Sequence, residues 1–485
     1  MLRSFIPFFA LLTFSFSAYG QPDTLWSALY ELDAWNICNG FETTEDGGFL
    51  IAGSIGPDYN DVSFWLMKAD SSGNLLWSSE YADSNSISDA AYDMLLLDED
   101  HILLAGWTLD NSASDYDIRL IMTHGDGEII WEKFIGESVY DEYVNKVSLT
   151  SDGGYIFTGG KGITGAENLL LLKTDSLGNV QWERSFTLNM QDVGTTVFQT
   201  YDGGYLLGGR TKYAGGGYDC VVIKTDSGGE MEWQNIFDFG WPYTSITRLY
   251  EVPGGGYIGL VSELTKSTTV IFKLDESGNL VWDSRTDMGH ATDMLEMPDA
   301  TKICCGYTGD MDLSDVYAIG NGEGIFIMLT DTLGQPIWDA IYQKPAMVNH
   351  GGGHISTMDD GGYCIAASVQ RAAGLVSIWL LRFGECTGVE EHGSALPPYI
   401  LCECHPNPFS SSTTIMYELS EPADVRISIF DIAGRRVGSF NREGQEAGQH
   451  QVVWDPDGSI PAGCYTVLLE SDEFRVTRRC VKATE

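Results

Sequence analysis

Acidic, amide and imidazole side chains recur about ten residues before a repeated turn in this 485-residue sequence. The candidate binding residues are Asn36, Asp89, Glu142, Asp192, His290 and His350, and the same count from the turn aspartate or its equivalent gives Thr244 and Gly289, next to His290. Carboxylates that face one another repel, and a hard cation such as Ca²⁺ relieves this repulsion. The pattern predicts either a polar ring that binds a cation or another ligand, or solvated residues at the starts of strands.

Other residue types that carry chemistry lack the spacing that such chemistry needs. His350 and His354 flank three glycines in NHGGGH, and CECH (402–405) has no partner cluster that would complete a zinc site. The sequence has no nucleophile elbow, phosphate-binding loop or metalloprotease motif. We therefore expect no catalytic residue and no cofactor, with Ca²⁺ as the one candidate ion.

A turn motif that ends in tryptophan recurs along the chain, first as KADSSGNLLW (68–77). The other copies are THGDGEIIW (123–131), KTDSLGNVQW (173–182), KTDSGGEMEW (224–233), KLDESGNLVW (273–282) and LTDTLGQPIW (329–338). A glycine lies four residues before each tryptophan. An aspartate lies seven before it, except at His124. A binding site is usually built once, so a device repeated in this way indicates architecture.

Hairpin signals lie about 30 residues before these tryptophans. They are EDGGFLIAG (45–53), SDGGYIFTG (151–159), YDGGYLLGG (201–209), PGGGYIGLV (253–261) and DDGGYCIAA (359–367), with degenerate copies at 98–106 and 298–306. Each repeat of about 50 residues thus has room for four strands. Seven such repeats predict an all-β fold with a seven-bladed β-propeller over residues 21–385.

The two ends of the array predict how the ring closes. The seventh repeat has no turn with a tryptophan strand, whereas DTLWSALYE (23–31) at the other end carries Trp26, 51 residues before Trp77. We expect this N-terminal strand to complete the last blade and to remove the open sheet edges. The expected blade anchors are Trp26, Trp77, Trp131, Trp182, Trp233, Trp282 and Trp338.

The order Asp, Gly, Trp resembles the repeats of pyrroloquinoline quinone dehydrogenases, and Cys304-Cys305 resembles the vicinal disulfide of those enzymes. Those propellers have eight blades, and a quinone would occupy one site rather than six equivalent ones. We therefore expect the aspartate to accept backbone N–H bonds, the glycine to take a left-handed conformation and the tryptophan to pack between blades.

The N-terminus and the composition indicate export. Residues 1–20 have one arginine, an apolar run and a small-residue ending, as a signal peptide does, and the run is too short to span a bilayer. No second such run follows, so we expect no transmembrane segment in the mature chain. The ten cysteines then default to disulfides. A net charge of −42 argues against nucleic acid as a partner.

The C-terminal 81 residues, after a proline-containing linker at 386–404, have short alternating strands that predict a small immunoglobulin-like β-sandwich. Residues 405–485 resemble the type A C-terminal sorting domain of the type IX secretion system, itself similar to the immunoglobulin-like domain of flagellar hook-capping proteins. The matching residues are Pro406-Asn407-Pro408-Phe409, Thr413-Thr414, Val425 to Phe430, Asp431, Gly434-Arg435, Gly448, His450, Trp454, Pro461-Ala462-Gly463, Tyr465 and Arg478-Arg479.

This resemblance implies passage through that machinery and display at the cell surface. Cys464 and Cys480 depart from the family pattern. Folding the last hairpin about Asp472 places them opposite each other, so we predict a cross-strand disulfide.

The propeller repeats resemble those that precede such sorting domains in Bacteroidota-like secreted proteins. The sequence thus predicts a secreted or cell-surface scaffold, not an enzyme, that binds a glycan, a protein or an extracellular polymer. The alternative is an enzyme at the channel mouth, either a quinoprotein-like oxidoreductase or a polysaccharide lyase or hydrolase. Aromatic residues spread over the loops of many blades would favour the scaffold. A single pocket of unpaired carboxylates and histidines would favour the enzyme.

Overall fold

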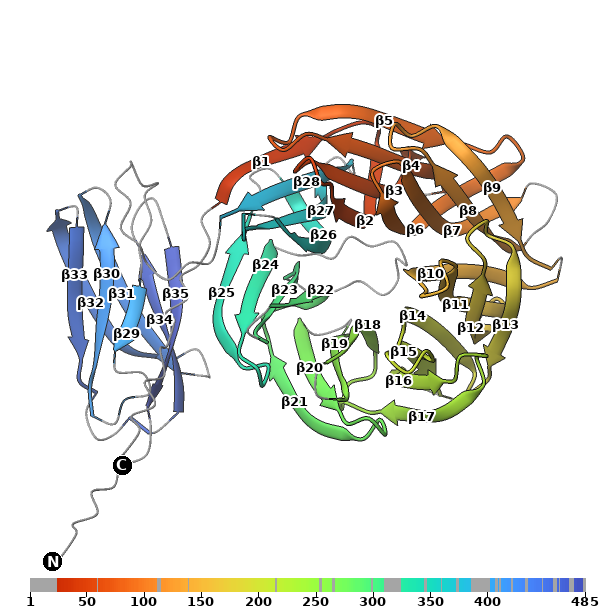
Figure 1. Cartoon of the computed structure of the whole chain (residues 1–485). Coiled ribbons are helices and arrows are strands. Elements are labelled where there is room, and N and C mark those ends of the chain that lie inside the picture. Colours follow the sequence, from red (N-terminus) through yellow and green to blue (C-terminus); the bar gives the residue numbers. More distant parts are fainter. Residues whose placement is uncertain are drawn as a thin grey trace, which may run out of the picture. The chain divides into compact units, whose positions relative to one another are not determined.

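Seven four-stranded antiparallel sheets follow one another around a ring, which confirms the predicted seven-bladed propeller (Figure 1). This computed structural model describes residues 24–482 except 59, 111–114, 138, 214–215, 253–254, 264–266, 298–299, 309–323, 344–346, 359, 372–374, 385–401, 406–408, 410, 420–421, 432–434, 447, 457–459, 462 and 471–474. The predicted signal peptide at 1–20 and most of the predicted linker at 386–404 therefore lie outside the described residues. Among the residues that are described, no helix is long and apolar enough to cross a membrane.

Each blade has an inner, a second, a third and an outer strand. The inner strands are β2 (Trp35–Thr43), β6 (Ser86–Asp98), β10 (Asp141–Leu149), β14 (Gln191–Gln199), β18 (Thr244–Glu251), β22 (His290–Glu296) and β26 (Met347–Thr357). The second strands are β3 (Phe49–Asp58), β7 (His101–Asp110), β11 (Tyr155–Ile163), β15 (Tyr205–Lys212), β19 (Tyr257–Glu263), β23 (Lys302–Tyr307) and β27 (Tyr363–Arg371). The third strands are β4 (Asp61–Ala69), β8 (Tyr116–Thr123), β12 (Ala166–Thr174), β16 (Tyr218–Thr225), β20 (Thr268–Leu274), β24 (Ile325–Thr330) and β28 (Val376–Phe383). The outer strands are β1 (Thr24–Tyr30), β5 (Leu75–Tyr81), β9 (Ile129–Ile135), β13 (Val180–Phe186), β17 (Met231–Phe237), β21 (Leu280–Thr286) and β25 (Pro336–Tyr342).

The N-terminal strand closes the ring as predicted. β1 pairs antiparallel with β28, from Thr24 opposite Phe383 to Tyr30 opposite Ile378, and the last sheet has the order β1-β28-β27-β26. An N-terminal strand therefore supplies the outer strand of the blade whose other three strands come from the end of the array. The ring is held shut by a β-ladder and buried side chains.

In six of the seven blades the tryptophan of the outer strand packs against the turn glycine of the next blade. A Cβ added to Gly229 would lie 2.7 Å from the ring of Trp182, and one added to Gly73 would lie 2.6 Å from Trp26. Both glycines have a φ near 80°, a conformation that side chains disfavour. The same contact joins Trp77 to Gly127, Trp131 to Gly178, Trp233 to Gly278 and Trp282 to Gly334, whereas Trp338 packs in the core of the last two blades. Six of the seven predicted anchor tryptophans therefore contact the turn of the next blade.

The lysine of the turn motif ties the third strand to the hairpin of its own blade. Lys224 Nζ lies 2.8 Å from Asp202, and Lys173 Nζ lies 2.9 Å from Asp152. Each lysine is almost fully buried, while its aspartate is more than half exposed. The two halves of the repeat signature, the Asp-Gly-Gly turn and the Lys-x-Asp turn, are therefore linked by an ion pair that the sequence analysis did not predict.

Six of the ten cysteines are described in the structure as free thiols, so the predicted disulfides do not form at these positions. Cys38, Cys220, Cys304, Cys305, Cys364 and Cys480 are free and buried. Cys304 and Cys305 are adjacent in β23 but belong to different core clusters, because neighbouring residues of a strand point to opposite faces. The likeness of this pair to a vicinal disulfide does not extend to its geometry.

The C-terminal unit is a sandwich of a three-stranded and a four-stranded sheet, with the orders β29-β30-β33 and β32-β31-β34-β35. Its strands are β29 (Cys402–His405), β30 (Thr413–Leu419), β31 (Ala423–Asp431), β32 (Arg436–Gln445), β33 (Gly448–Trp454), β34 (Gly463–Glu470) and β35 (Arg475–Lys482). Phe409 and Tyr465 pack on Trp454 in its core, with ring centroids 5.3 and 5.2 Å from that ring. β29 includes 402–404, so the domain begins earlier in the sequence than the expected boundary at 405.

The predicted disulfide between Cys464 and Cys480 is wrong. The last hairpin pairs Cys464 with Val481 and Tyr465 with Cys480, so the register differs by one residue from a fold centred on Asp472. A shift of one residue moves a side chain to the other face of the sheet. Cys480 is instead a free thiol in the sandwich core.

Candidate functional site in the central channel

The sequence-predicted binding residues lie at the starts of the inner strands, as expected, but they are buried. Asn36, Asp89, Glu142, Asp192 and His290 are each at most 2% exposed, and so is Thr244. His350 lies in β26, but its side chain is outside the described residues. Instead of one polar ring open to the channel, the described members form separate contacts beneath the loops that join the blades.

Asp192 shows what these residues do. Its Oδ2 accepts the backbone N–H groups of Leu188 and Asn189 at 2.7 and 3.1 Å, and its Oδ1 accepts the hydroxyl of Thr211 at 2.5 Å. The Nδ2 of Asn36 donates to the carbonyl oxygen of Val376 in the neighbouring blade at 2.7 Å. These side chains satisfy backbone groups that the turns leave unpaired, so they position the loops between blades.

Three further members also have local partners. Asp89 Oδ2 accepts from Arg119 at 2.9 Å and from Ser86 at 2.7 Å. Burial raises the pKa of Glu142 to about 7, and Lys161 Nζ lies 3.2 Å from its Oε1. His290 stacks on Tyr307 with ring centroids 4.9 Å apart. No group of three or more ligating side chains that could hold a metal ion is found among the residues that the structure describes.

The inner strands each contain a β-bulge about three residues further along. The register shifts at Asn39, Tyr92, Asn145, Thr195, Thr247, Thr292 and the Gly351-Gly352 pair. Bulge side chains bond to the next blade: Asn39 Nδ2 donates to the carbonyl of Ala91, and Asn145 Nδ2 to that of Gly194, both at 2.8 Å. Thr292 Oγ1 donates to the carbonyl of Gly353 at 2.5 Å. A belt of bulges thus joins neighbouring blades around the channel.

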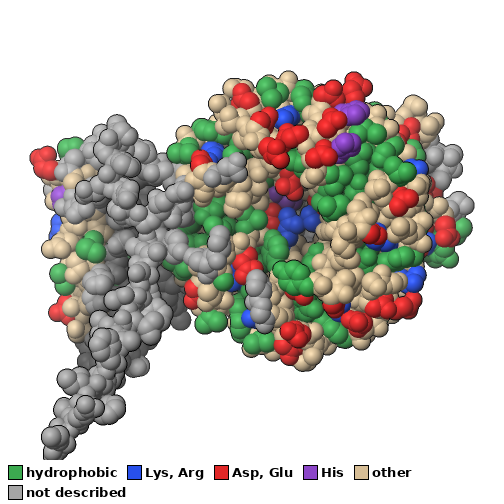
Figure 2. All heavy atoms as spheres, viewed as in Figure 1, with side chains coloured by type: hydrophobic (Ala, Val, Ile, Leu, Met, Phe, Trp, Pro, Cys, Tyr) green, Lys and Arg blue, Asp and Glu red, His purple; other side chains and the backbone are tan. Residues whose placement is uncertain are grey.

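A second set of equivalent positions, which we call the channel ring, consists of the residue after the bulge in six blades and of His354, the second residue after the bulge, in the last blade. Its members are Gly40, Asp93, Lys146, Thr196, Arg248, Asp293 and His354, which pair with equivalent residues of the second strands. Figure 2 shows basic, acidic and histidine side chains together in the central hollow of the propeller. The bulge directs these side chains toward the adjacent blade and the axis, where charges from different blades meet.

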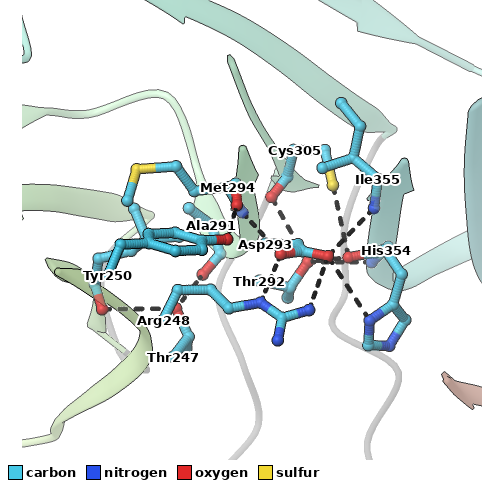
Figure 3. A network of polar contacts seen from close by, with 12 residues as sticks. Thr247, Arg248, Tyr250, Ala291, Thr292, Asp293, Met294, Cys305, His354 and Ile355 are labelled. Carbon is cyan, nitrogen blue, oxygen red and sulfur yellow. Dashed lines mark hydrogen bonds and ion pairs between the residues drawn. The ribbon is translucent and has the colours of Figure 1, made fainter. Parts of the chain in front are cut away.

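Asp293 is the centre of the largest polar network in the ring (Figure 3). Its two carboxylate oxygens accept from the Nε and the second terminal nitrogen of Arg248 at 2.5 and 2.9 Å, which is a bidentate pair. Oδ2 also accepts the backbone N–H of Ile355 at 3.1 Å and lies 3.8 Å from Nδ1 of His354. One aspartate therefore connects three blades.

A second, smaller network repeats this design in another part of the ring. Asp93 Oδ1 lies 2.8 Å from Lys146 Nζ, and its Oδ2 accepts the backbone N–H of Val147 at 2.9 Å. Val147 and Ile355 both follow a ring position of the next blade. Each ring aspartate therefore holds the backbone just after a neighbouring bulge.

The protonation states follow from burial and these partners. Burial by itself would raise the pKa of Asp293, but Arg248 holds it below the usual range. Burial lowers the pKa of His354 to about 4, so this imidazole is neutral at pH 7. Burial also raises the pKa of Glu42, which lies two residues beyond the ring position of its blade. The channel thus combines two paired aspartates with a neutral histidine and a carboxyl group that readily takes a proton.

Aromatic and basic side chains gather on the face of the propeller where the inner strands begin, which we call the mouth face. Lys161 lies over the ring of Tyr140 at 5.9 Å, and Arg285 lies over Trp241 at 5.1 Å. Arg210 and Lys212 both lie over Tyr218, at 4.8 and 5.2 Å. In blade two, Trp107 and Tyr116 pack edge to face at 4.9 Å. Because strands alternate in direction, the starts of first and third strands and the ends of second and fourth strands all reach this face.

Sequence reasoning did not identify the channel ring. The residues differ in type from blade to blade, and their equivalence depends on bulges that each add one residue to the inner strand. The available signal was the presence of charged residues at a strand position where other copies carry glycine or threonine, such as Arg248 and Asp293 against Gly40 and Thr196.

Comparisons with known proteins give one family match and several similar solved structures. The FlgD Ig-like domain family matches residues 409–473. Among solved structures, the chain is similar to Sqt1 from Chaetomium thermophilum at 10% identity, covering 72% of this chain and 82% of that one, with a TM-score of 0.42. A protein of unknown function from Dyadobacter fermentans is 11% identical, with coverage of 74% and 99% and a TM-score of 0.43. A GH43 β-1,3-galactosidase is 12% identical, with coverage of 75% and 94% and a TM-score of 0.33. No curated protein sequence matches the chain.

Proposed function

We propose that this protein is a secreted or cell-surface binding scaffold whose ligand, a glycan or a protein, docks on the mouth face of the propeller. The observation that carries the proposal is the spread of aromatic–cation pairs over successive blades, at Tyr140, Tyr218 and Trp241. Tyrosine, tryptophan and arginine are the residues that contribute most binding energy at interfaces, because they present a large rigid face with a polar end.

The charged groups of the channel favour a structural role over catalysis. Asp93 and Asp293 are each used by a cation and by a backbone N–H group. A general acid or base needs an accessible proton and a pKa near the working pH. Arg248 holds the pKa of Asp293 below its usual range, and Asp93 is engaged by an ion pair with Lys146, so neither meets this need and the ring is better suited to holding the blades together.

A binding assay with matched aromatic variants tests the proposal. We expect labelled full-length protein to bind a subset of a glycan array or an immobilised extracellular extract. Tyr140→Ala and Trp241→Ala should each reduce binding at least tenfold. Tyr201 is 80% exposed in a hairpin turn on the opposite face, so Tyr201→Ala is the matched control. Equal binding by all four proteins, or loss only with Tyr201→Ala, would contradict the assignment of the mouth face.

We also propose that the C-terminal domain delivers the protein through the type IX secretion machinery. The supporting observations are the two-sheet immunoglobulin-like sandwich, the match at 409–473 and the motif residues in its core, such as Phe409, Trp454 and Tyr465. Deletion of 402–485, which removes β29 together with the rest of the domain, should leave the propeller inside the cell envelope. Surface labelling of intact cells measures this, and undiminished display would refute the role of the domain.

An enzyme is the second candidate, and Glu42 is the observation that favours it. Its pKa is raised by burial, and Lys146 and Arg248 are close enough to oppose this shift. Such a carboxyl group resembles a general acid in its protonation behaviour. The enzyme proposal predicts turnover of a polysaccharide that is abolished by Glu42→Gln with binding retained. A quinone-dependent activity would instead show as visible absorbance of the purified protein.

A further inference from the structure

Blade two departs from the repeat at two turns, and a histidine stands at each departure. His124 replaces the aspartate that opens the other five Asp-x-x-Gly turns, and His101 begins β7 directly after the short hairpin turn at Glu99 and Asp100. In the other turns the aspartate accepts two backbone N–H bonds, as Asp175 does from Leu177 and Asn179, both at 2.9 Å. Histidine at position 124 forgoes these bonds, so the turn alone gives no reason for the exchange.

The two histidines are neighbours in space, although 23 positions separate them in the sequence. Their ring centroids are 6.4 Å apart, and each side chain is 46% exposed. Figure 2 shows exposed histidine side chains beside acidic ones on the upper part of the propeller in that view. Both turns lie on the face opposite to the mouth face, so the pair is remote from the proposed ligand surface.

A separate aspartate holds each imidazole. Nδ1 of His101 lies 2.8 and 3.0 Å from the two oxygens of Asp98, and Nδ1 of His124 lies 3.1 Å from Oδ2 of Asp100. A carboxylate can only accept, so in the neutral imidazole Nδ1 carries the proton and Nε2 has a free lone pair. A carboxylate on the second ring nitrogen is the arrangement that orients metal-binding histidines and strengthens them as ligands.

The rings are close enough to share an ion after a small movement of the side chains. A Zn²⁺–N bond of about 2.1 Å places the ion about 3.2 Å from each ring centroid, so a tetrahedral angle at the ion puts the two centroids about 5 Å apart. The observed 6.4 Å is about 1 Å wider, and the two half-exposed side chains have room to close this gap. No larger group of ligating side chains accompanies the pair among the described residues, so water would complete the coordination.

We propose that His101 and His124 form a surface site for a borderline divalent transition-metal ion such as Zn²⁺, bound through Nε2 of both rings. The ligand set of two imidazoles with carboxylates behind them prefers Zn²⁺, Cu²⁺ or Ni²⁺ over Ca²⁺, which takes six or more oxygen ligands. The acidic groups around the pair, Asp98, Asp100 and Asp126, add an attractive field for any cation. The site goes beyond the proposed binding function and does not depend on it.

Isothermal titration of the full chain with Zn²⁺ at fixed ionic strength tests the proposal. We expect one site in the wild type and at least a tenfold loss of affinity in His101→Gln and in His124→Asp. His124→Asp restores the residue that the other turns carry, so its fold and thermal midpoint should be retained. His450→Gln in the C-terminal domain is the control and should bind Zn²⁺ as the wild type does.

A parallel titration with Ca²⁺ separates a histidine site from attraction to the chain's many carboxylates. Excess Ca²⁺ should not displace Zn²⁺. Displacement by Ca²⁺, wild-type affinity in both single variants, or loss of binding in the control variant would each overturn the proposal, because binding would then depend on other groups.

Discussion

Two sets of ion pairs hold this propeller together, and they differ in how they are encoded. On the hairpin turns, Lys173–Asp152 and Lys224–Asp202 repeat one design at the same motif position with the same geometry. In the channel ring, Arg248–Asp293 and Lys146–Asp93 join neighbouring blades through residues that share no motif. The repeated pairs stabilise a blade, whereas the channel pairs lock one blade to the next. A repeat can therefore specify its own unit while the contacts that close the ring are specified individually.

Removing Asp293 should have the largest effect on stability. Asp293→Ala leaves the guanidinium of Arg248 without its bidentate partner and frees the backbone N–H of Ile355, so we expect a loss of about 3–5 kcal/mol. Urea unfolding followed by tryptophan fluorescence measures it. Asp293→Asn keeps the shape and some hydrogen bonds and should lose less. An effect under about 1 kcal/mol would mean that the channel pair does not lock the blades.

The pH dependence of stability should distinguish the buried carboxyl group of Glu142 from the aspartates of the hairpin turns. Its folded-state pKa of about 7 lies above its ordinary value of 4.5, so the folded state holds the proton more tightly. Its ionisation therefore lowers stability progressively as the pH rises from 4.5 through 7, by at most about 3 kcal/mol. Glu142→Gln should abolish this decline, which thermal unfolding at several pH values would show. An unchanged slope would contradict the buried environment of Glu142.

The aspartates of the hairpin turns should affect stability at acidic pH, opposite to the range in which Glu142 acts. Asp46, Asp152 and Asp202 have pKa values lowered to about 2. Thr44 and Thr150 hydroxyls are the main cause for the first two, with Lys68 and Lys173 adding to it. Lys224 lowers the third against the effect of burial. Their contribution to the free energy of unfolding is complete above about pH 4 and is lost as the pH falls from about 4 to 2. Asp202→Asn should remove part of this acid limb and leave the profile above pH 5 unchanged.

Mutation of single turn pairs should have a smaller effect than mutation of the channel pair. Asp202→Ala and Asp152→Ala each remove a half-exposed partner, so we expect about 1 kcal/mol apiece. The two sites lie in different blades and should add within about 0.5 kcal/mol in the double variant. Strong non-additivity, measured by urea unfolding, would show that the turn pairs also couple neighbouring blades.

Of these changes, the addition of a reductant should have the smallest effect on stability. The six described thiols are buried and unpaired, including Cys480 in the sandwich and Cys305 near the channel ring. The action of a reductant on these six cysteines should therefore change the free energy of unfolding by less than about 0.5 kcal/mol, and a thiol reagent should label them only after unfolding. Rapid labelling of Cys480 in the native protein would contradict its core position.

The sequence could predict the features that depend on local turn chemistry and on counting. Glycines that need a positive φ, such as Gly73 and Gly229, mark turns wherever they occur, and the tryptophans mark the outer strands at similar intervals of 49 to 56 residues. The blade number, the closing strand at Trp26 and the anchoring role of the motif follow from this pattern. These signals lie within a few residues of the element that they specify, so no knowledge of distant contacts is needed.

Only the tertiary structure decided which polar residues share a space. Asp192 and Asn36 stand where a channel ligand was expected, but the neighbouring loops bury them and use their hydrogen bonds. One extra residue at the bulge of each inner strand moves the convergence of charges to Arg248 and Asp293, and one residue of register separates Cys464 from Cys480. Because side chains alternate between the faces of a strand, a shift of one residue reverses every orientation, and the pairing of whole strands determines that register.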